Sequence, residues 1–212
     1  LQPSPTPTPP LDDDFNNPQR DPDKFNYGSL STDPTGFDQR VSVQQQNGHL
    51  EIKPVADAFG THYNGYTTVS AVDVSAHSPS VEVVQAASGA QTIYSLGSDL
   101  NNNFGFMVAS AGSMPAALKR KLAITPADAA LLLIFQIRLN GQLTALSLPY
   151  DPVAHRYWRF RHDPLPNAIL FETSADNLAW TVRHSVVLQK AVTPMAVELS
   201  SGTSTTSSSP GM

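Results

Sequence analysis

A chain of 212 residues, 40% hydrophobic and 15% charged, can bury one sizeable core, so we expect a single domain. Its formal net charge of −5 gives no positive field for a phosphate backbone, and nucleic acid is not an expected partner. No window approaches the roughly 18 apolar residues that a membrane span needs, and the lack of cysteine excludes disulfides, thiolate metal sites and a cysteine nucleophile.

Residues 1–10 read LQPSPTPTPP, with proline at nearly every second position. Proline fixes φ and lacks a backbone donor, so this segment is predicted to be an extended tail rather than a helix. Threonine beside proline is also typical of O-glycosylated stalks, which makes Thr6 and Thr8 candidate glycosylation sites.

Residues 11–199 carry short β-branched and aromatic runs separated by Gly, Asn, Asp and Pro. The period of two in these runs predicts an antiparallel all-β domain. The expected strands are 41–44, 49–53, 65–69, 80–86, 92–96, 104–109, 131–139, 142–148, 157–162, 168–173, 179–184 and 193–199. Asn47-Gly48 and Asn140-Gly141 each join two runs and suit the positive φ angles of type I′ hairpin turns.

Two segments depart from this pattern. Within 115–130, a basic cluster precedes Thr125 and Pro126, which suit the cap and first position of one short helical turn in a projecting loop. Residues 200–212 are rich in serine and threonine and offer little apolar area to bury. They are predicted to form a disordered tail in isolation.

The stretch 150–184, YDPVAHRYWRFRHDPLPNAILFETSADNLAWTVRH, reads as three consecutive antiparallel strands, whose alternation assigns side chains to two faces. The face predicted to be core carries Trp158, Phe160, Ile169, Phe171, Trp180 and Val182. The polar face carries Tyr157, Arg159, Arg161, Glu172, Thr181 and Arg183. We expect Glu172 to form cross-strand ion pairs with Arg159 and Arg161.

Together with LDDDFNN at 11–17, NGHLEIKP at 47–54 and SLGSDLNNNFGF at 95–106, this stretch resembles a family of bacterial extracellular concanavalin-like β-sandwich domains. The resemblance implies a jelly roll that is secreted or displayed at the cell surface. Family members tend to add one more apolar strand after the Pro-Gly that stands here at 210–211, so the resemblance also implies an unfilled sheet position.

Residues for catalysis do not converge in the sequence, and we expect a non-catalytic protein that requires no cofactor. The glutamates Glu51, Glu82, Glu172 and Glu198 stand singly on different expected strands, so they predict no carboxylate pair around a glycosidic bond. The histidines lack zinc-binding spacing, and no Gly-x-Ser-x-Gly elbow is present.

Two kinds of ligand site remain as hypotheses. Calcium prefers hard oxygen ligands, for which the candidates are Asp12, Asp13, Asp14, Asp99 and Asn101. The alternative is that these are ordinary turn residues. Sugar binding needs an exposed aromatic ring beside planar hydrogen-bonding groups, for which the candidates are Tyr63, Tyr66, Tyr157, Arg159, Arg161 and Arg183.

Two functions compete on this evidence. The first, which we favour, is a self-associating extracellular subunit of a surface or filamentous assembly, a homo-oligomer or polymer held by addition of a tail or edge strand. The residues assigned to this role are Pro3, Pro5, Pro7, Pro9, Leu11 and Phe15. The second is a carbohydrate-binding or adhesion module with glycans as partners, as the fold analogy suggests.

Overall fold

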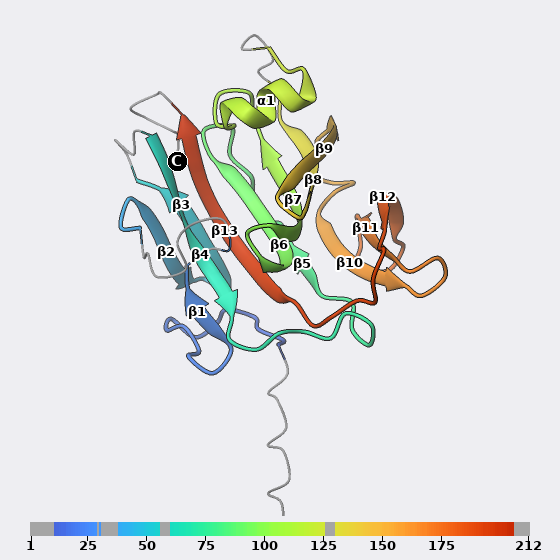
Figure 1. Ribbon diagram of the computed structural model, residues 1–212. Helices are drawn as coiled ribbons and strands as arrows, with labels where there is room; N and C mark the ends of the chain where they lie inside the picture. Colours follow the sequence, from blue (N-terminus) through green and yellow to red (C-terminus); the bar gives the residue numbers. More distant parts are fainter. Residues whose placement is uncertain (1–10, 29, 31–37, 56–59, 126–129, 206–212) are drawn as a thin grey trace, which may run out of the picture.

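The computed structural model describes residues 11–28, 30, 38–55, 60–125 and 130–205, and within them the protein is almost entirely β (Figure 1). These residues form thirteen strands and one short helix. Every expected strand overlaps an observed one, which confirms the all-β class, and the three-residue strand β1 was not anticipated. No helix in this part of the chain is long and apolar enough to cross a membrane.

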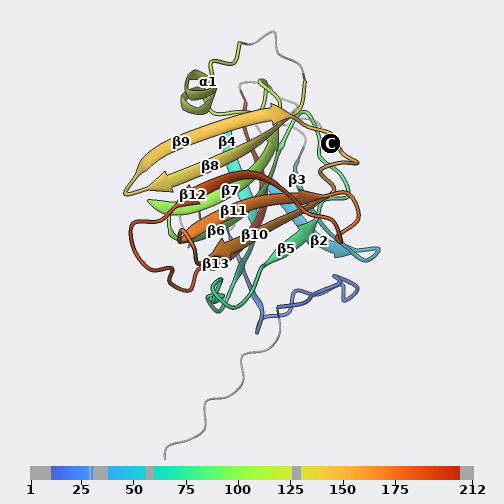
Figure 2. The same ribbon diagram turned by 90° about the vertical axis from the view of Figure 1, so that its right-hand side faces the viewer.

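The strands form two antiparallel layers. The first is a seven-stranded sheet in the order β1 (Phe25–Tyr27), β4 (Gly60–Thr68), β13 (Ala196–Thr205), β6 (Gln91–Asp99), β7 (Asn102–Ala109), β8 (Leu132–Leu139) and β9 (Gln142–Pro149). Facing it is a four-stranded sheet in the order β12 (Thr181–Val187), β11 (Ala168–Ser174), β10 (Tyr157–Asp163) and β5 (Ser80–Glu82) (Figure 2). A separate hairpin of β2 (Val41–Gln46) and β3 (His49–Pro54) also packs against the large sheet.

Both predicted Asn-Gly turns are confirmed. Asn47 and Gly48 have φ angles of 54° and 72°, and Asn140 and Gly141 have 52° and 77°. Asn and Gly tolerate this left-handed region, and two such residues in succession match the twist of the flanking strands. The turns fix the register of the two hairpins, β2–β3 and β8–β9.

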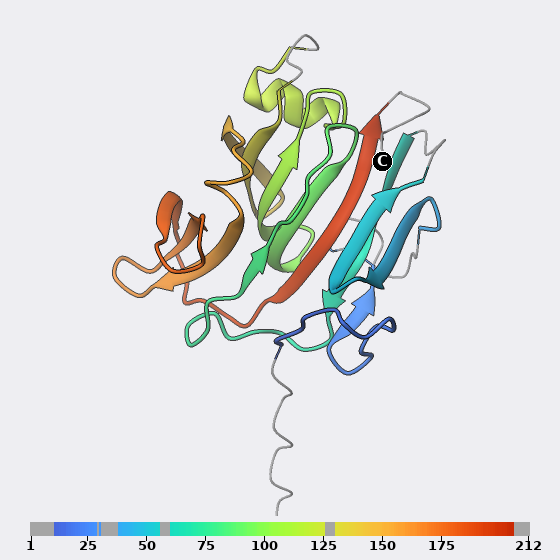
Figure 3. The same cartoon turned by 180° about the vertical axis from the view of Figure 1, so that it is seen from behind.

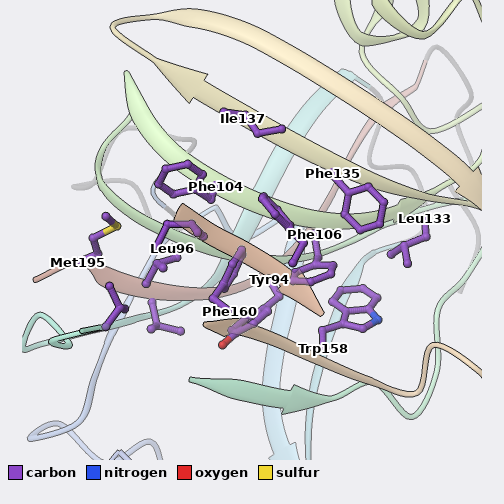
Figure 4. Packing of buried hydrophobic residues seen from close by; sticks show 14 of the residues in the cluster. Tyr94, Leu96, Phe104, Phe106, Leu133, Phe135, Ile137, Trp158, Phe160 and Met195 are labelled. Carbon is purple, nitrogen blue, oxygen red and sulfur yellow. The ribbon is translucent and has the colours of Figure 1, made fainter. Parts of the chain in front are cut away.

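The main core lies between the two sheets, where inward side chains from both layers meet (Figure 4). Phe106 is fully buried at its centre, with ring centroids 5.4 Å from Trp158, 5.0 Å from Phe160 and 5.2 Å from Phe171. Burial of one such side chain stabilises the fold by roughly 1.5–3 kcal/mol. The predicted core positions on β10 and β11 are therefore confirmed.

The helix lies earlier than the sequence suggested. α1 spans Ala116–Leu122, with Pro115 before its first residue and a left-handed Ala123 after its last, whereas Thr125 follows the helix and Pro126 lies outside the described residues. Its residues AALKRKL are all strong helix formers, and the basic side chains of its last turn favour the negative end of the helix dipole. Leu118 covers a second apolar cluster on the outer face of the large sheet.

The C-terminal domain boundary expected at residue 199 is too early. β13 continues to Thr205 at the centre of the large sheet, paired with β4 on one side and β6 on the other. Ser200, Ser201 and Thr203 are buried there. The N–H and C=O groups of this segment form hydrogen bonds with the two neighbouring strands. Side-chain composition does not report this backbone pairing. Residues 206–212 lie outside the described part.

The inward assignment of Trp180 and Val182 is wrong. The β11–β12 register shifts between Phe171 and Glu172, so that Phe171 faces His184 and Glu172 faces Val182. Such a bulge inserts one residue and reverses the alternation beyond it. Val182 is consequently 50% exposed, and Trp180 lies under the guanidinium of Arg159, 4.0 Å from ring centre to Cζ.

Candidate functional site

The layer that faces the large sheet is interrupted by a cleft. β5 is the last strand of the four-stranded sheet, and β3 is the inner strand of the β2–β3 hairpin. Both line a cleft of about 1720 Å³, with β6 and β13 of the large sheet beneath it. Figure 3 shows the hairpin and the small sheet on the same side of the large sheet, with β13 passing between them. The volume exceeds the roughly 300–1,000 Å³ of small-molecule pockets.

The β5 wall presents backbone groups to the cleft. The Val83 N–H donates to the Arg156 carbonyl (2.7 Å), and the Pro79 carbonyl accepts from the Phe160 N–H (3.1 Å), so these residues face β10. Backbone groups alternate direction along a strand. Ser80 and Glu82 therefore direct their N–H and C=O groups away from β10 and toward the cleft.

The β3 wall does the same from the other side. Leu50 lies opposite Gln45, and Ile52 lies opposite Val43. In a hairpin closed by a two-residue turn, these pairs do not exchange hydrogen bonds with each other. Leu50 and Ile52 therefore direct their N–H and C=O groups away from β2, toward the cleft. Pro54 has the same direction but no donor, because proline lacks an N–H.

The floor of the cleft is largely apolar. It is formed by Thr92, Tyr94, Trp158, Val197, Leu199 and Ser201. Tyr94 is 2% exposed, and among the described residues its hydroxyl has no hydrogen-bond partner. Burial raises the pKa of this hydroxyl, which stays protonated. An unpaired buried hydroxyl is unfavourable, and this one is enclosed beneath the floor rather than open to the cleft.

The cleft is acidic. Its lining includes the carboxylates of Asp12, Asp13, Asp14, Asp23, Glu51 and Glu82, against the two lysines Lys24 and Lys53. Lys24 is itself held at the cleft end, where its Nζ contacts the Asp12 carbonyl (2.6 Å) and Asp13 Oδ2 (3.3 Å). This excess of negative charge disfavours anionic occupants.

The aromatic residues proposed for sugar binding are not brought together. Tyr63 is buried on the outer face of the large sheet, with its hydroxyl bonded to Gln91 (3.0 Å) and Ser204 (2.8 Å). Tyr66 is buried on the opposite face, and burial raises its pKa to about 12. Tyr157 lies on the small sheet beside Arg156, whose Cζ is 5.6 Å from the ring centre.

The three candidate arginines have partners of their own. Arg159 and Arg161 hold Glu172, at 2.6 and 2.9 Å, which confirms the predicted cross-strand ion pairs. Arg183 donates to Thr173 Oγ1 (2.8 Å). These three side chains and the tyrosines therefore form no common stacking platform in the described structure.

The calcium candidates cap turns. The Asp13 carboxylate accepts the Phe15 N–H (2.8 Å), and the Asp99 carboxylate accepts the Asn101 N–H (2.7 Å). A hydrogen bond from the Asn102 side chain helps lower the pKa of Asp99, and a backbone bond from Asn16 does so for Asp14. Within the described ranges, no group of three or more acidic or histidine side chains is arranged to hold a metal ion. A calcium site remains a prediction.

The residues assigned to assembly lie partly at the cleft. Leu11 and Phe15 both line it, Leu11 packs against the main core, and the Phe15 ring is 6.2 Å from that of Phe25. Pro3, Pro5, Pro7 and Pro9 lie outside the described residues. The wall residues were missed by sequence reasoning, because an open edge depends on strand order and no local pattern reports it.

Comparisons with known proteins assign no family to this chain. No family model matches it, and no curated protein shows a significant match. A function is therefore inferred from the cleft and its two walls.

Proposed function

We propose that this domain is a non-catalytic assembly module, which binds an extended polypeptide segment of another copy in the cleft between β3 and β5. The observation that carries the proposal is the pair of strand edges that line one cleft above an apolar floor. Open edges with free N–H and C=O groups bind extended chains by strand addition. A bound strand would widen the small sheet and cover the floor. An extracellular location rests on the sequence resemblance alone.

The nature of the lining supports a polypeptide over a glycan. Tyr94 and Trp158, the aromatic residues of the floor, are 2% and 0% exposed, so neither presents a ring face for a sugar. Backbone edges, in contrast, match the regular spacing of donors and acceptors along another strand. Carbohydrate binding therefore ranks second.

The carboxylates of the cleft support a non-catalytic role. Glu51 and Glu82 stand on opposite walls, where a glycosidase would require its acid and its base or nucleophile. Each is already engaged by its own neighbour, Glu51 with Gln46 Nε2 (2.7 Å) and Glu82 with Arg156 Nε (2.7 Å).

Proline substitution at the β5 wall tests the proposal. Ser80 and Val84 have exposed side chains, and by alternation from Val83 their N–H groups point to the cleft. The variant Ser80→Pro/Val84→Pro removes two donors, so we expect the dissociation constant for self-association to rise roughly tenfold or more. Sedimentation velocity over a concentration series measures it, and electron microscopy shows the particles.

The matched control is Val187→Pro. Val187 is half exposed on β12, at the far edge of the same sheet, and its N–H points outward because the Leu188 N–H binds the Asn167 carbonyl. We expect self-association equal to the wild type. A wild-type chain that stays monomeric at the highest concentration, or a Ser80→Pro/Val84→Pro variant that associates normally, would overturn the proposal.

A further inference from the structure

Strand addition in the cleft, as proposed above, requires an extended segment, and the chain itself contains a candidate. We infer that residues 1–10 of a second copy occupy the cleft as a strand that pairs through one edge only. The inference rests on the proposed function, and it names the partner segment and its orientation.

The proline content of residues 1–10 predicts an extended conformation before any contact forms. Prolines at 3, 5, 7, 9 and 10 fix their own φ angles, and each restricts the residue before it to the β or polyproline region. Little backbone entropy is then lost on binding, which is the usual penalty for ordering a flexible segment.

The spacing of the prolines leaves donors on one edge. In an extended strand, N–H groups of alternate residues point to opposite edges. One edge of such a strand would carry no donor, because its odd-numbered positions are Pro3, Pro5, Pro7 and Pro9. The other edge would keep the N–H groups of the even-numbered residues Gln2, Ser4, Thr6 and Thr8. Proline is tolerated in a strand when its own edge is unpaired. The donor edge therefore pairs with β5, whose Ser80 and Glu82 groups face the cleft.

The same alternation would place the odd-numbered and even-numbered side chains on opposite faces of the strand. Residues two apart share a face, so the proline rings lie on one side and the polar side chains on the other. The rings then contact the apolar floor at Val197 and Leu199, and threonine and serine face the solvent at the mouth of the cleft. Residues 1–10 carry no charged side chain, so the acidic lining does not repel them.

A second copy is favoured over the same molecule. Leu11 is anchored on the core at the end of its own cleft. To enter that cleft, residues 1–10 would have to reverse direction immediately before Leu11. A residue that precedes proline prefers an extended conformation, so the Pro9-Pro10 sequence disfavours a tight reversal at this point. This favours binding of the segment by a neighbouring molecule.

Removal of N–H donors from the even-numbered positions distinguishes a paired strand from a flexible tail that makes no specific backbone contacts. In Thr6→Pro/Thr8→Pro the donor edge loses two N–H groups, so we expect a roughly tenfold or larger rise in the dissociation constant for self-association. Thr6→Val/Thr8→Val keeps both donors and the β-branched shape, and it should associate like the wild type. Equal association of both variants would overturn the inference.

Cross-linking tests the partner, since the chain has no cysteine of its own. An equimolar mixture of the single variants Thr6→Cys and Ser80→Cys should yield a disulfide-linked heterodimer on mild oxidation, in excess over Thr6→Cys mixed with Val187→Cys. Equal yields in the two mixtures would overturn the inference. So would an intramolecular disulfide in the double variant Thr6→Cys/Ser80→Cys at high dilution, which would show that the tail occupies its own cleft.

Deletion of residues 1–10 separates this inference from the proposed function. If the truncated chain still associates while Ser80→Pro/Val84→Pro does not, another segment fills the cleft, and only the inference about residues 1–10 is wrong. If Ser80→Pro/Val84→Pro associates normally, both proposals fail. Loss of association on truncation supports both.

Discussion

The Arg159 guanidinium lies 4.0 Å from the centre of the Trp180 ring and at the same time donates to Glu172 Oε2. Arg161 binds the other oxygen of that carboxylate at 2.9 Å. Glu172 is only 2% exposed, so two arginines, one of them stacked on an indole, hold a nearly buried negative charge on the outer face of the small sheet. A buried charge needs such partners, because it is removed from water.

We predict that Glu172→Gln lowers the free energy of unfolding by about 2–3 kcal/mol. Loss of one partner of a buried ion pair costs about 3–5 kcal/mol, and the figure is reduced here because the arginine side chains remain 22% and 38% exposed to water. Urea denaturation measures the change. Arg156→Gln, at the exposed pair with Glu82, should cost much less, because solvent screens this pair, and equal costs would contradict this account.

The fold was largely predictable where local periodicity determines it. Strand positions and the turns at Asn47 and Asn140 follow from side-chain alternation and from the φ tolerance of Asn and Gly. Trp180 was misplaced, because a bulge in the β11–β12 pairing leaves no clear signal in one sequence. Ser200 and its neighbours were misassigned to a tail, because composition does not report the strands that pair on both sides.

The candidate site was less predictable than the fold. The ion pairs of Glu172 could be expected, since Arg159 lies directly opposite Glu172 on the adjacent strand and Arg161 is a diagonal neighbour on the same face. The cleft edges at Leu50 and Ser80 lie in segments that appear as ordinary strands in the sequence. Their exposure arises from the order of strands in the sheets, which depends on contacts between residues far apart in the chain.

We predict that Gly202→Ala destabilises the large sheet by about 1–3 kcal/mol, as expected for overpacking. A Cβ at Gly202 would overlap the His62 carbonyl oxygen and the Tyr63 ring of the adjacent β4. Gly112→Ala is the matched control, since its Cβ would meet Ser110 Oγ at an ordinary 3.5 Å. Thermal unfolding compares the two variants, and an unchanged midpoint for Gly202→Ala would show that β13 does not pack as described.

We predict that the protein loses stability between pH 7.5 and pH 5. Burial lowers the pKa of both His155 and His184 below 6.5, and the charge of Arg183 adds to the effect on His155. The folded state then binds protons more weakly than the unfolded chain. The stability contributed by the two neutral histidines is therefore fully present above pH 6.5, and it is lost as the pH falls through 6.5 toward their lowered pKa values in the folded state.

The melting temperature across this range measures the effect. His184 stacks near Phe135 and Phe171, with ring centroids at 6.3 and 5.9 Å, so His184→Leu should reduce the pH dependence. His77 is exposed, so His77→Gln should leave the pH dependence of the melting temperature unchanged. Aspartates such as Asp99, whose pKa is lowered from 3.8, affect stability only in more acidic solution. A melting temperature that is constant from pH 7.5 to 5 would refute the prediction.

We predict that Tyr94→Phe leaves the stability of the monomer unchanged or raises it slightly. The Tyr94 hydroxyl is buried without a hydrogen-bond partner in the described structure, so its removal eliminates an unsatisfied polar group and breaks no bond. Tyr63→Phe is the matched control, because it removes a hydroxyl bonded to Gln91 and Ser204 and should cost about 1–2 kcal/mol. Urea denaturation of the truncated chain lacking residues 1–10 gives both values with the proposed occupant absent. A loss at Tyr94 as large as that at Tyr63 would contradict this account, because it would reveal a partner for the hydroxyl within the remaining chain.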